Sequence, residues 1–145
     1  MQEISLIARQ KVEMIRTQLP NRTYRAANAL RNASIDVLQK QAGHGGRWYR
    51  VPGTRQRYRA SAPGQVPAVR TGSFMRSWRP KAISSGDTHQ AIIESTVKTD
   101  NGAYVLGDIL ENGTPGGQMA PRPHQKKILK AAKPDILRIY EEDYF

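Results

Sequence analysis

The residues of this sequence best suited to catalysis do not lie in patterns that support it. His44, His89 and His124 lie in a predicted loop, a predicted strand and a predicted helix start, at spacings that do not match a metal site. Ser73 lacks the glycine spacing of a nucleophile elbow, and Glu94 has no neighbouring carboxylate for paired acid–base chemistry. We therefore predict that the protein is not an enzyme and has no cofactor and no metal site.

Binding of anions is the chemistry that the sequence favours. Between Val37 and Ser85 there are ten lysines and arginines and no aspartate or glutamate. Guanidinium groups match phosphate and carboxylate oxygens, and the interleaved aromatic rings can stack on bases. Acidic protein surfaces and DNA both remain open as partners. The candidate contact residues are Arg47, Arg50, Arg55, Arg57 and Arg59.

The composition of the whole chain points in the same direction. The 145 residues have a formal net charge of +11, and 38% of them are hydrophobic, which suits one domain with a modest core. Such a charge favours an anionic partner, either nucleic acid or an acidic protein surface. The absence of cysteine excludes a disulfide framework and a thiolate metal site. No apolar run approaches the roughly 18 residues that a membrane span needs, so we expect no membrane association.

The elements that must position the arginine-rich segment begin with helical periodicity. Residues 3–18 form a predicted amphipathic helix that Pro20 ends, because proline has no N–H to donate. A second helix is predicted over residues 21–41, with Gly43 as its terminator. We expect both apolar faces to pack into the core; a partly exposed face that contacts another subunit is the alternative. The first face consists of Ile4, Ala8, Val12, Ile15 and Leu19, and the second of Ala27, Leu30, Ser34, Val37, Leu38 and Gln41.

The segment after these helices predicts a hairpin and then a pair of strands. Residues 47–51 and 57–59 can form the two arms of the hairpin, joined by a turn at Pro52, Gly53 and Thr54. Thr71 is predicted to cap a short helix over residues 73–77. Strands are predicted over residues 81–84 and 88–99, with a turn at residues 85–87.

Two helices complete the predicted elements. A short helix is predicted over residues 104–111 and ends at Gly113. The last helix follows Pro123 and is expected to kink at Pro134. Together the elements predict an α+β fold with long N-terminal helices, a small antiparallel sheet packed with short and C-terminal helices, and an extended basic loop or hairpin.

We expect a single domain over residues 1–145. Within it, residues 1–42 form the helical part, residues 43–70 the basic extended loop and residues 71–145 the strand–helix core.

Two segments carry short motifs in a defined order: residues 61–78 (SAPGQVPAVRTGSFMRSW) and residues 103–125 (AYVLGDILENGTPGGQMAPRPHQ). In that order the sequence resembles the tail-completion or neck proteins of long-tailed double-stranded DNA phages and prophages. The order and spacing carry the resemblance, which spans most of the chain with the preceding helices. His124 departs from the family, which usually has an aromatic residue such as phenylalanine there. The motif residues are Ala62, Pro63, Thr71, Gly72, Arg76, Ser77, Tyr104, Glu111, Gly113, Thr114, Ala120, Pro121, Arg122 and Pro123.

The resemblance implies a non-enzymatic structural virion protein, located in the neck between head and tail and assembled in the host cytoplasm. Proteins of this kind form a ring, commonly of six copies, between the portal or head-connector proteins and the tail tube or tail terminator. On this account the arginines of residues 47–59 contact acidic neighbouring subunits or the packaged DNA. The alternative is a basic nucleic-acid-binding protein that acts on its own.

Overall fold

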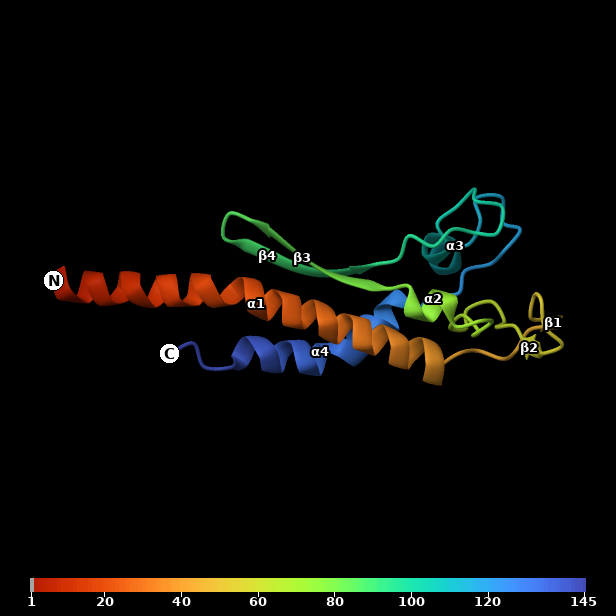
Figure 1. The fold of residues 1–145 in the computed structure, drawn as a ribbon, viewed down its shortest axis with the longest axis horizontal. Helices are drawn as coiled ribbons and strands as arrows, with labels where there is room; N and C mark the ends of the chain where they lie inside the picture. The colour runs from red at the N-terminus through yellow and green to blue at the C-terminus, as the bar shows by residue number, and fades with distance from the viewer. Residues whose placement is uncertain (1) are drawn as a thin grey trace.

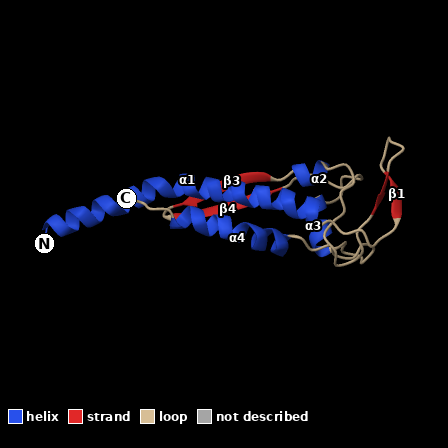
Figure 2. Cartoon of the chain, turned by 90° about the horizontal axis from the view of Figure 1, so that it is seen from below, coloured by secondary structure: helices blue, strands red, loops and turns tan. Residues whose placement is uncertain are grey.

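One helix, α1 (Gln2–Lys40), runs along most of the length of the structure, a computed structural model that describes residues 2–145 (Figure 1). A β-hairpin and a second long helix lie alongside the carboxyl-terminal part of α1, and its amino-terminal end projects beyond them (Figures 1 and 2). The predicted α+β class is confirmed. The remaining elements are β1 (Trp48–Arg50), β2 (Arg57–Arg59), α2 (Ser73–Arg76), β3 (Arg79–Ser85), β4 (Thr88–Glu94), α3 (Leu106–Asn112) and α4 (Gln125–Glu141).

α1 is a single helix where the sequence predicts two, because Pro20 lies inside it without ending it. A proline removes one intrahelical hydrogen bond and costs roughly 3 kcal/mol in a helix interior. Pro20 is exposed, so water can reach the carbonyl group that loses its donor. Arg22 and Thr23, two and three residues after the proline, are buried, and the Thr23 hydroxyl lies 2.9 Å from the Tyr140 hydroxyl of α4. This packing holds the helix in line through the proline.

The carboxyl-terminal half of α1 buries the apolar face that the sequence predicts. Ala27 and Ser34 are fully buried, and Val37 and Leu38 are each 2% exposed. Gln41 is the exception, because it follows the last residue of the helix and is exposed. The helical spacing therefore identifies the core-facing side of this half.

In the amino-terminal half of α1 the predicted core packing is wrong. Ile4 is 72% exposed and Val12 is 44% exposed, and Ala8 is also exposed, whereas Ile15 and Leu19 are half-buried. The apolar residues recur at helical spacing as predicted, but this part of α1 projects beyond the hairpin and α4 (Figure 1). We call its exposed large side chains the amino-terminal apolar surface: Ile4, Leu6, Ile7, Val12 and Met14.

β3 and β4 form an antiparallel hairpin that packs on α1, with Arg79 opposite Glu94. Its turn is at Gly86 and Asp87, within the predicted residues 85–87, and Ser85 is the last residue of β3. β4 ends at Glu94 and not at residue 99, because β3 begins at Arg79 and offers no partner beyond it. Pro80 lies within β3, which is tolerated because both strands of a two-stranded sheet are edge strands.

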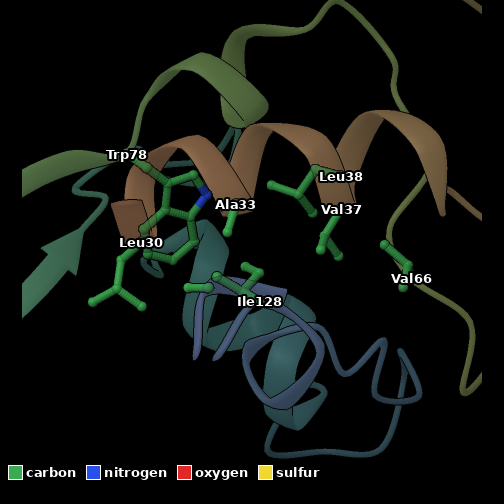
Figure 3. Packing of buried hydrophobic residues seen from close by; sticks show 8 residues of the cluster. Leu30, Ala33, Val37, Leu38, Val66, Trp78 and Ile128 are labelled. Atoms are coloured by element: carbon green, nitrogen blue, oxygen red, sulfur yellow. The ribbon is translucent and has the colours of Figure 1, made fainter. Parts of the chain in front are cut away.

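The core lies where α1, α2, α4 and the chain around Val66 meet (Figure 3). Trp78 follows α2 and is 6% exposed, with its ring edge-on to Phe74 at 5.6 Å between centroids. Phe74 and Ile93 are partly buried against the cluster. The buried members are Leu30, Ala33, Val37, Leu38, Val66, Trp78, Ile128 and Ala132.

α4 divides its apolar residues between core and surface. Ile128 and Ala132 are buried, whereas Leu129 and Leu137 are exposed. The helix continues through Pro134. Leu129 and Leu137 are exposed because, among residues 2–145, only one side of α4 packs against the rest of the chain.

Arg22 joins the carboxyl-terminal end of α4 to α1. The residue is 4% exposed, and its guanidinium donates hydrogen bonds to the carbonyl oxygens of Ile139 at 3.0 Å and Glu142 at 2.6 Å. It also donates to the Asp143 carbonyl oxygen at 2.7 Å and lies 3.6 Å from the centroid of the Tyr144 ring. Carbonyl groups at a helix end have no intrahelical donor, and a positive charge is favourable there.

Arg25 reinforces this junction from the surface. Its guanidinium donates two hydrogen bonds to the carboxylate of Glu142, at 2.6 and 2.7 Å. These hydrogen bonds lower the pKa of Glu142 from its ordinary value. Glu142 thus has a partner within its own chain.

Replacing Arg22 with methionine is expected to lower the free energy of unfolding by about 2–3 kcal/mol, because the end of α4 loses a charged hydrogen-bond donor. Urea unfolding followed by circular dichroism measures the change. Arg25→Met is the matched control, one turn further along α1, where the exposed ion pair predicts a much smaller effect. Equal effects of the two variants would contradict the role assigned to Arg22.

Candidate functional site

The five arginines predicted to contact a partner lie on or beside the ribbon of β1 and β2. Arg50 and Arg57 are paired across the two strands, and Arg59 lies in β2. Arg47 directly precedes β1, and Arg55 lies in the connecting turn. All five are exposed, and the ribbon lies at the end of the molecule opposite the amino terminus (Figures 1 and 2). The predicted hairpin is confirmed.

The arginines of the ribbon have few partners of their own. Within the described residues, 2–145, none of the five lies in an ion pair with a carboxylate. Arg59 alone among them makes a side-chain hydrogen bond there, from Nε to the carbonyl oxygen of Gly46 at 3.0 Å. Most of their N–H donors are therefore available to a ligand.

The two motif segments, far apart in the sequence, are hydrogen-bonded to each other. The Gly64 amide donates to the carbonyl oxygen of Pro121 at 2.9 Å. The guanidinium of Arg122 donates to the carbonyl oxygen of Ser61 through both Nε and Nη2, each at 3.2 Å. Ala62–Pro63 lies between these two contacts. Pro121 and Arg122 of the second motif segment thus hold the first motif segment in place.

α2 begins directly after the motif residues Thr71 and Gly72. Gly72, and not Thr71 as predicted, is the residue that precedes the helix, with a left-handed φ of 81°. The Thr71 hydroxyl still accepts a hydrogen bond from the Ser73 amide at 3.2 Å. The left-handed turn at Gly72 brings that hydroxyl back over the helix start, so both motif residues contribute to it.

Glu111 of α3 caps the amino terminus of α4. Its Oε2 atom accepts hydrogen bonds from the backbone amides of His124 at 2.8 Å and Gln125 at 3.1 Å. The first amides of a helix have no intrahelical acceptor, and a negative charge is favourable beside them. The motif glutamate therefore has a structural role in this chain.

Gly113 and Thr114 shape the loop that follows α3. Gly113 ends the helix with φ 79° and ψ 175°, a conformation that is essentially restricted to glycine. The Thr114 amide donates to the Met119 carbonyl oxygen at 3.0 Å, and the Thr114 hydroxyl accepts from the Met119 amide at 2.9 Å. The closed loop returns the chain to residues 121–123, directly before His124, the residue that precedes α4.

The histidines occupy three different environments. His124 is fully buried, with its ring edge-on to Phe74 at 5.8 Å and to Trp78 at 6.1 Å between centroids. It thus packs against aromatic rings, as the aromatic residue expected there from the resemblance would. His44 is exposed, and His89 is half-buried in β4. Among residues 2–145 no group of three or more histidine or acidic side chains is arranged to hold a metal ion.

An apolar groove of about 220 Å³ lies between α1, β4 and α4. Its lining has no histidine and no carboxylate, so the described residues there supply no acid, base or metal ligand. The lining residues are Leu30, Trp78, Ile93, Gln125, Ile128 and Leu129.

Trp48 belongs to the ribbon surface but is not among the predicted contact residues. It is 59% exposed and lies directly opposite Arg59. The signal for it was the two-residue spacing between Trp48 and Arg50, which places both side chains on the same face of a strand.

No family model, curated protein or solved structure matches this chain. None of the helices described for residues 2–145 combines the length and the apolar character that crossing a membrane requires.

Proposed function

We propose that this protein is a structural component of the phage neck, a tail-completion or head–tail connector protein that joins the portal-connector to the tail. The observation that carries the proposal is the mutual packing of the two motif segments. Arg122 binds the Ser61 carbonyl, and Glu111 caps the helix that follows the second segment. If the motifs come from a shared fold, they are expected to pack against each other. Segments that resemble a family by chance are not expected to do so.

The exposed surfaces of the chain also suit a subunit of a ring. The amino-terminal apolar surface lies at one end of the molecule and the arginine ribbon at the other (Figure 1). Contiguous exposed apolar side chains are typical of a surface that a partner covers. In a closed ring each copy contacts the next through two different surfaces, so unlike surfaces at separated sites of one chain are what a ring requires.

The proposed role places the protein in the virion, between head and tail, as one of about six copies per ring in keeping with the resemblance. Its partners are its own copies, the portal or head-connector proteins, and the tail tube or tail terminator. The role needs no catalysis, because the subunit acts by binding its neighbours.

The proposal is tested by deleting the gene in the phage or prophage that encodes the chain. Electron microscopy should show full heads and separate tails, and the wild-type chain supplied in trans should restore joined particles. Normal joining in the deletion would overturn the proposal.

A matched pair of variants tests the surface between copies. Ile4→Asp combined with Ile7→Asp should fail to restore joined particles, because it charges the amino-terminal apolar surface. Arg9→Asp makes the same change in net charge on the side of the exposed helix away from Ile4 and Ile7, and should restore them.

A further inference from the structure

The β1–β2 ribbon has two chemically different faces. Residues paired across an antiparallel ribbon share a face, as do residues two apart in one strand. Tyr49 and Tyr58 pair on one face, with ring centroids 6.0 Å apart. The opposite face, which we call the cationic face, consists of Trp48, Arg50, Arg57 and Arg59.

Arg50 and Arg57 lie directly opposite each other on the cationic face. Like charges at such a position repel each other and destabilise the pairing of the strands. Within residues 2–145 no carboxylate forms an ion pair with either arginine. An anion between the two guanidinium groups would remove the repulsion, and phosphate oxygens accept two parallel hydrogen bonds from one guanidinium.

Trp48 favours nucleic acid over an acidic protein surface as the source of that anion. Its indole is 59% exposed beside the arginines, where it offers a flat apolar ring to a ligand. An aromatic ring next to phosphate-binding cations is the arrangement that holds nucleotides, and stacking contributes about 1–3 kcal/mol per base. The chain also has no acidic residue between Asp36 and Asp87, so neither the ribbon nor the segments next to it in the sequence carry a carboxylate that would repel a polyanion.

We propose that the cationic face of the β1–β2 ribbon is a nucleic-acid-binding site. Arg50 and Arg57 hold a backbone phosphate between them, Arg59 binds a neighbouring phosphate, and Trp48 packs on a base or sugar. The inference deepens the proposed function and rests on it for one point, namely that the nucleic acid is the DNA that passes through the neck.

Fluorescence anisotropy of the full chain with a labelled 20-mer, as duplex and as single strand, tests the site across a range of salt concentrations. Binding should weaken with salt, and Arg50→Ala combined with Arg57→Ala should lower affinity about tenfold or more and reduce the log–log salt slope by about two. Trp48→Ala should weaken single-strand binding about 5- to 100-fold while leaving the salt slope unchanged.

Lys126→Ala combined with Lys130→Ala is the charge-matched control, because it removes two exposed cations from α4. It should change affinity less than about threefold at roughly 0.15 M salt, where the Debye length is only ~8 Å. Polyglutamate is the competitor that represents an acidic protein.

Failure to bind either nucleic acid near physiological salt, or equal losses in the two double variants, would overturn the inference. Displacement by polyglutamate at the same charge concentration as DNA would also overturn it. These outcomes leave the neck proposal standing, because that proposal is judged by head–tail joining. Conversely, nucleic-acid binding without a joining defect would support the site and reject the neck role.

Discussion

Replacing Trp78 with alanine is expected to lower the free energy of unfolding by about 3–5 kcal/mol, because it removes the largest side chain of the core. Trp78 is 6% exposed, and its ring contacts the rings of Phe74 and His124. It also lies against Gly107 of α3, where an added Cβ would be 3.6 Å from the indole. The site therefore joins α2, α3 and the start of α4, and a cavity there cannot be closed by moving one element.

Trp48→Ala is the matched control, since it makes the same change at a side chain that is 59% exposed. Its free energy of unfolding should stay within about 0.5 kcal/mol of the wild type. Urea unfolding followed by far-ultraviolet circular dichroism measures the free energy of unfolding of both variants without depending on tryptophan fluorescence. A change below about 1 kcal/mol in Trp78→Ala would contradict the core as described.

The sequence predicts the fold well wherever local periodicity coincides with intramolecular packing. The spacing of Ala27, Ser34 and Val37 identifies the buried side of α1, and those residues are buried. The glycine after α3 and the turn between β3 and β4 are likewise local features, because each depends on a few adjacent residues. Such features need no knowledge of distant parts of the chain.

The failures arise where the outcome depends on what lies nearby in space. Ile4 and Val12 have the same helical spacing as the buried residues, yet no other element among residues 2–145 covers them. Periodicity shows that a helix has an apolar side, but it does not show whether that side is covered within the chain. Pro20 failed as a terminator for a related reason, because packing of Arg22 against α4 outweighs a local preference.

For the candidate site, the sequence identifies the residue types and the strand register supplies their arrangement. Residues 47–59 are visibly rich in arginine, but the pairing of Arg50 with Arg57 depends on the length of the turn between the strands. Arg22 had a detectable signal, since it is a charged residue in phase with the apolar positions Ile15 and Ala26 of α1. Its partners, the carbonyl groups at the end of α4, become apparent only in the folded chain.

Replacing Gly113 with alanine is expected to lower the free energy of unfolding by about 3–5 kcal/mol, through backbone strain and overcrowding together. At φ 79° and ψ 175° a residue with a side chain is strained by about 1–3 kcal/mol. The added Cβ would also lie 2.7 Å from the Met119 carbonyl oxygen and 3.1 Å from Cδ of Pro121. Neither neighbour can move freely, because the loop is closed by the hydrogen bonds of Thr114 to Met119.

Two glycines in the same loop are the matched controls, and urea unfolding measures all three variants. Gly117 has φ 71° but nothing within 4 Å of an added Cβ, so Gly117→Ala should cost only the strain of about 1–2 kcal/mol. The nearest atom to a Cβ on Gly116 would be 3.9 Å away, so Gly116→Ala should be close to neutral. An effect at Gly113 no larger than that at Gly117 would show that crowding plays no part. Because Gly113 supports the fold, Gly113→Ala should lower the urea midpoint, whereas the ribbon variants should keep the wild-type midpoint.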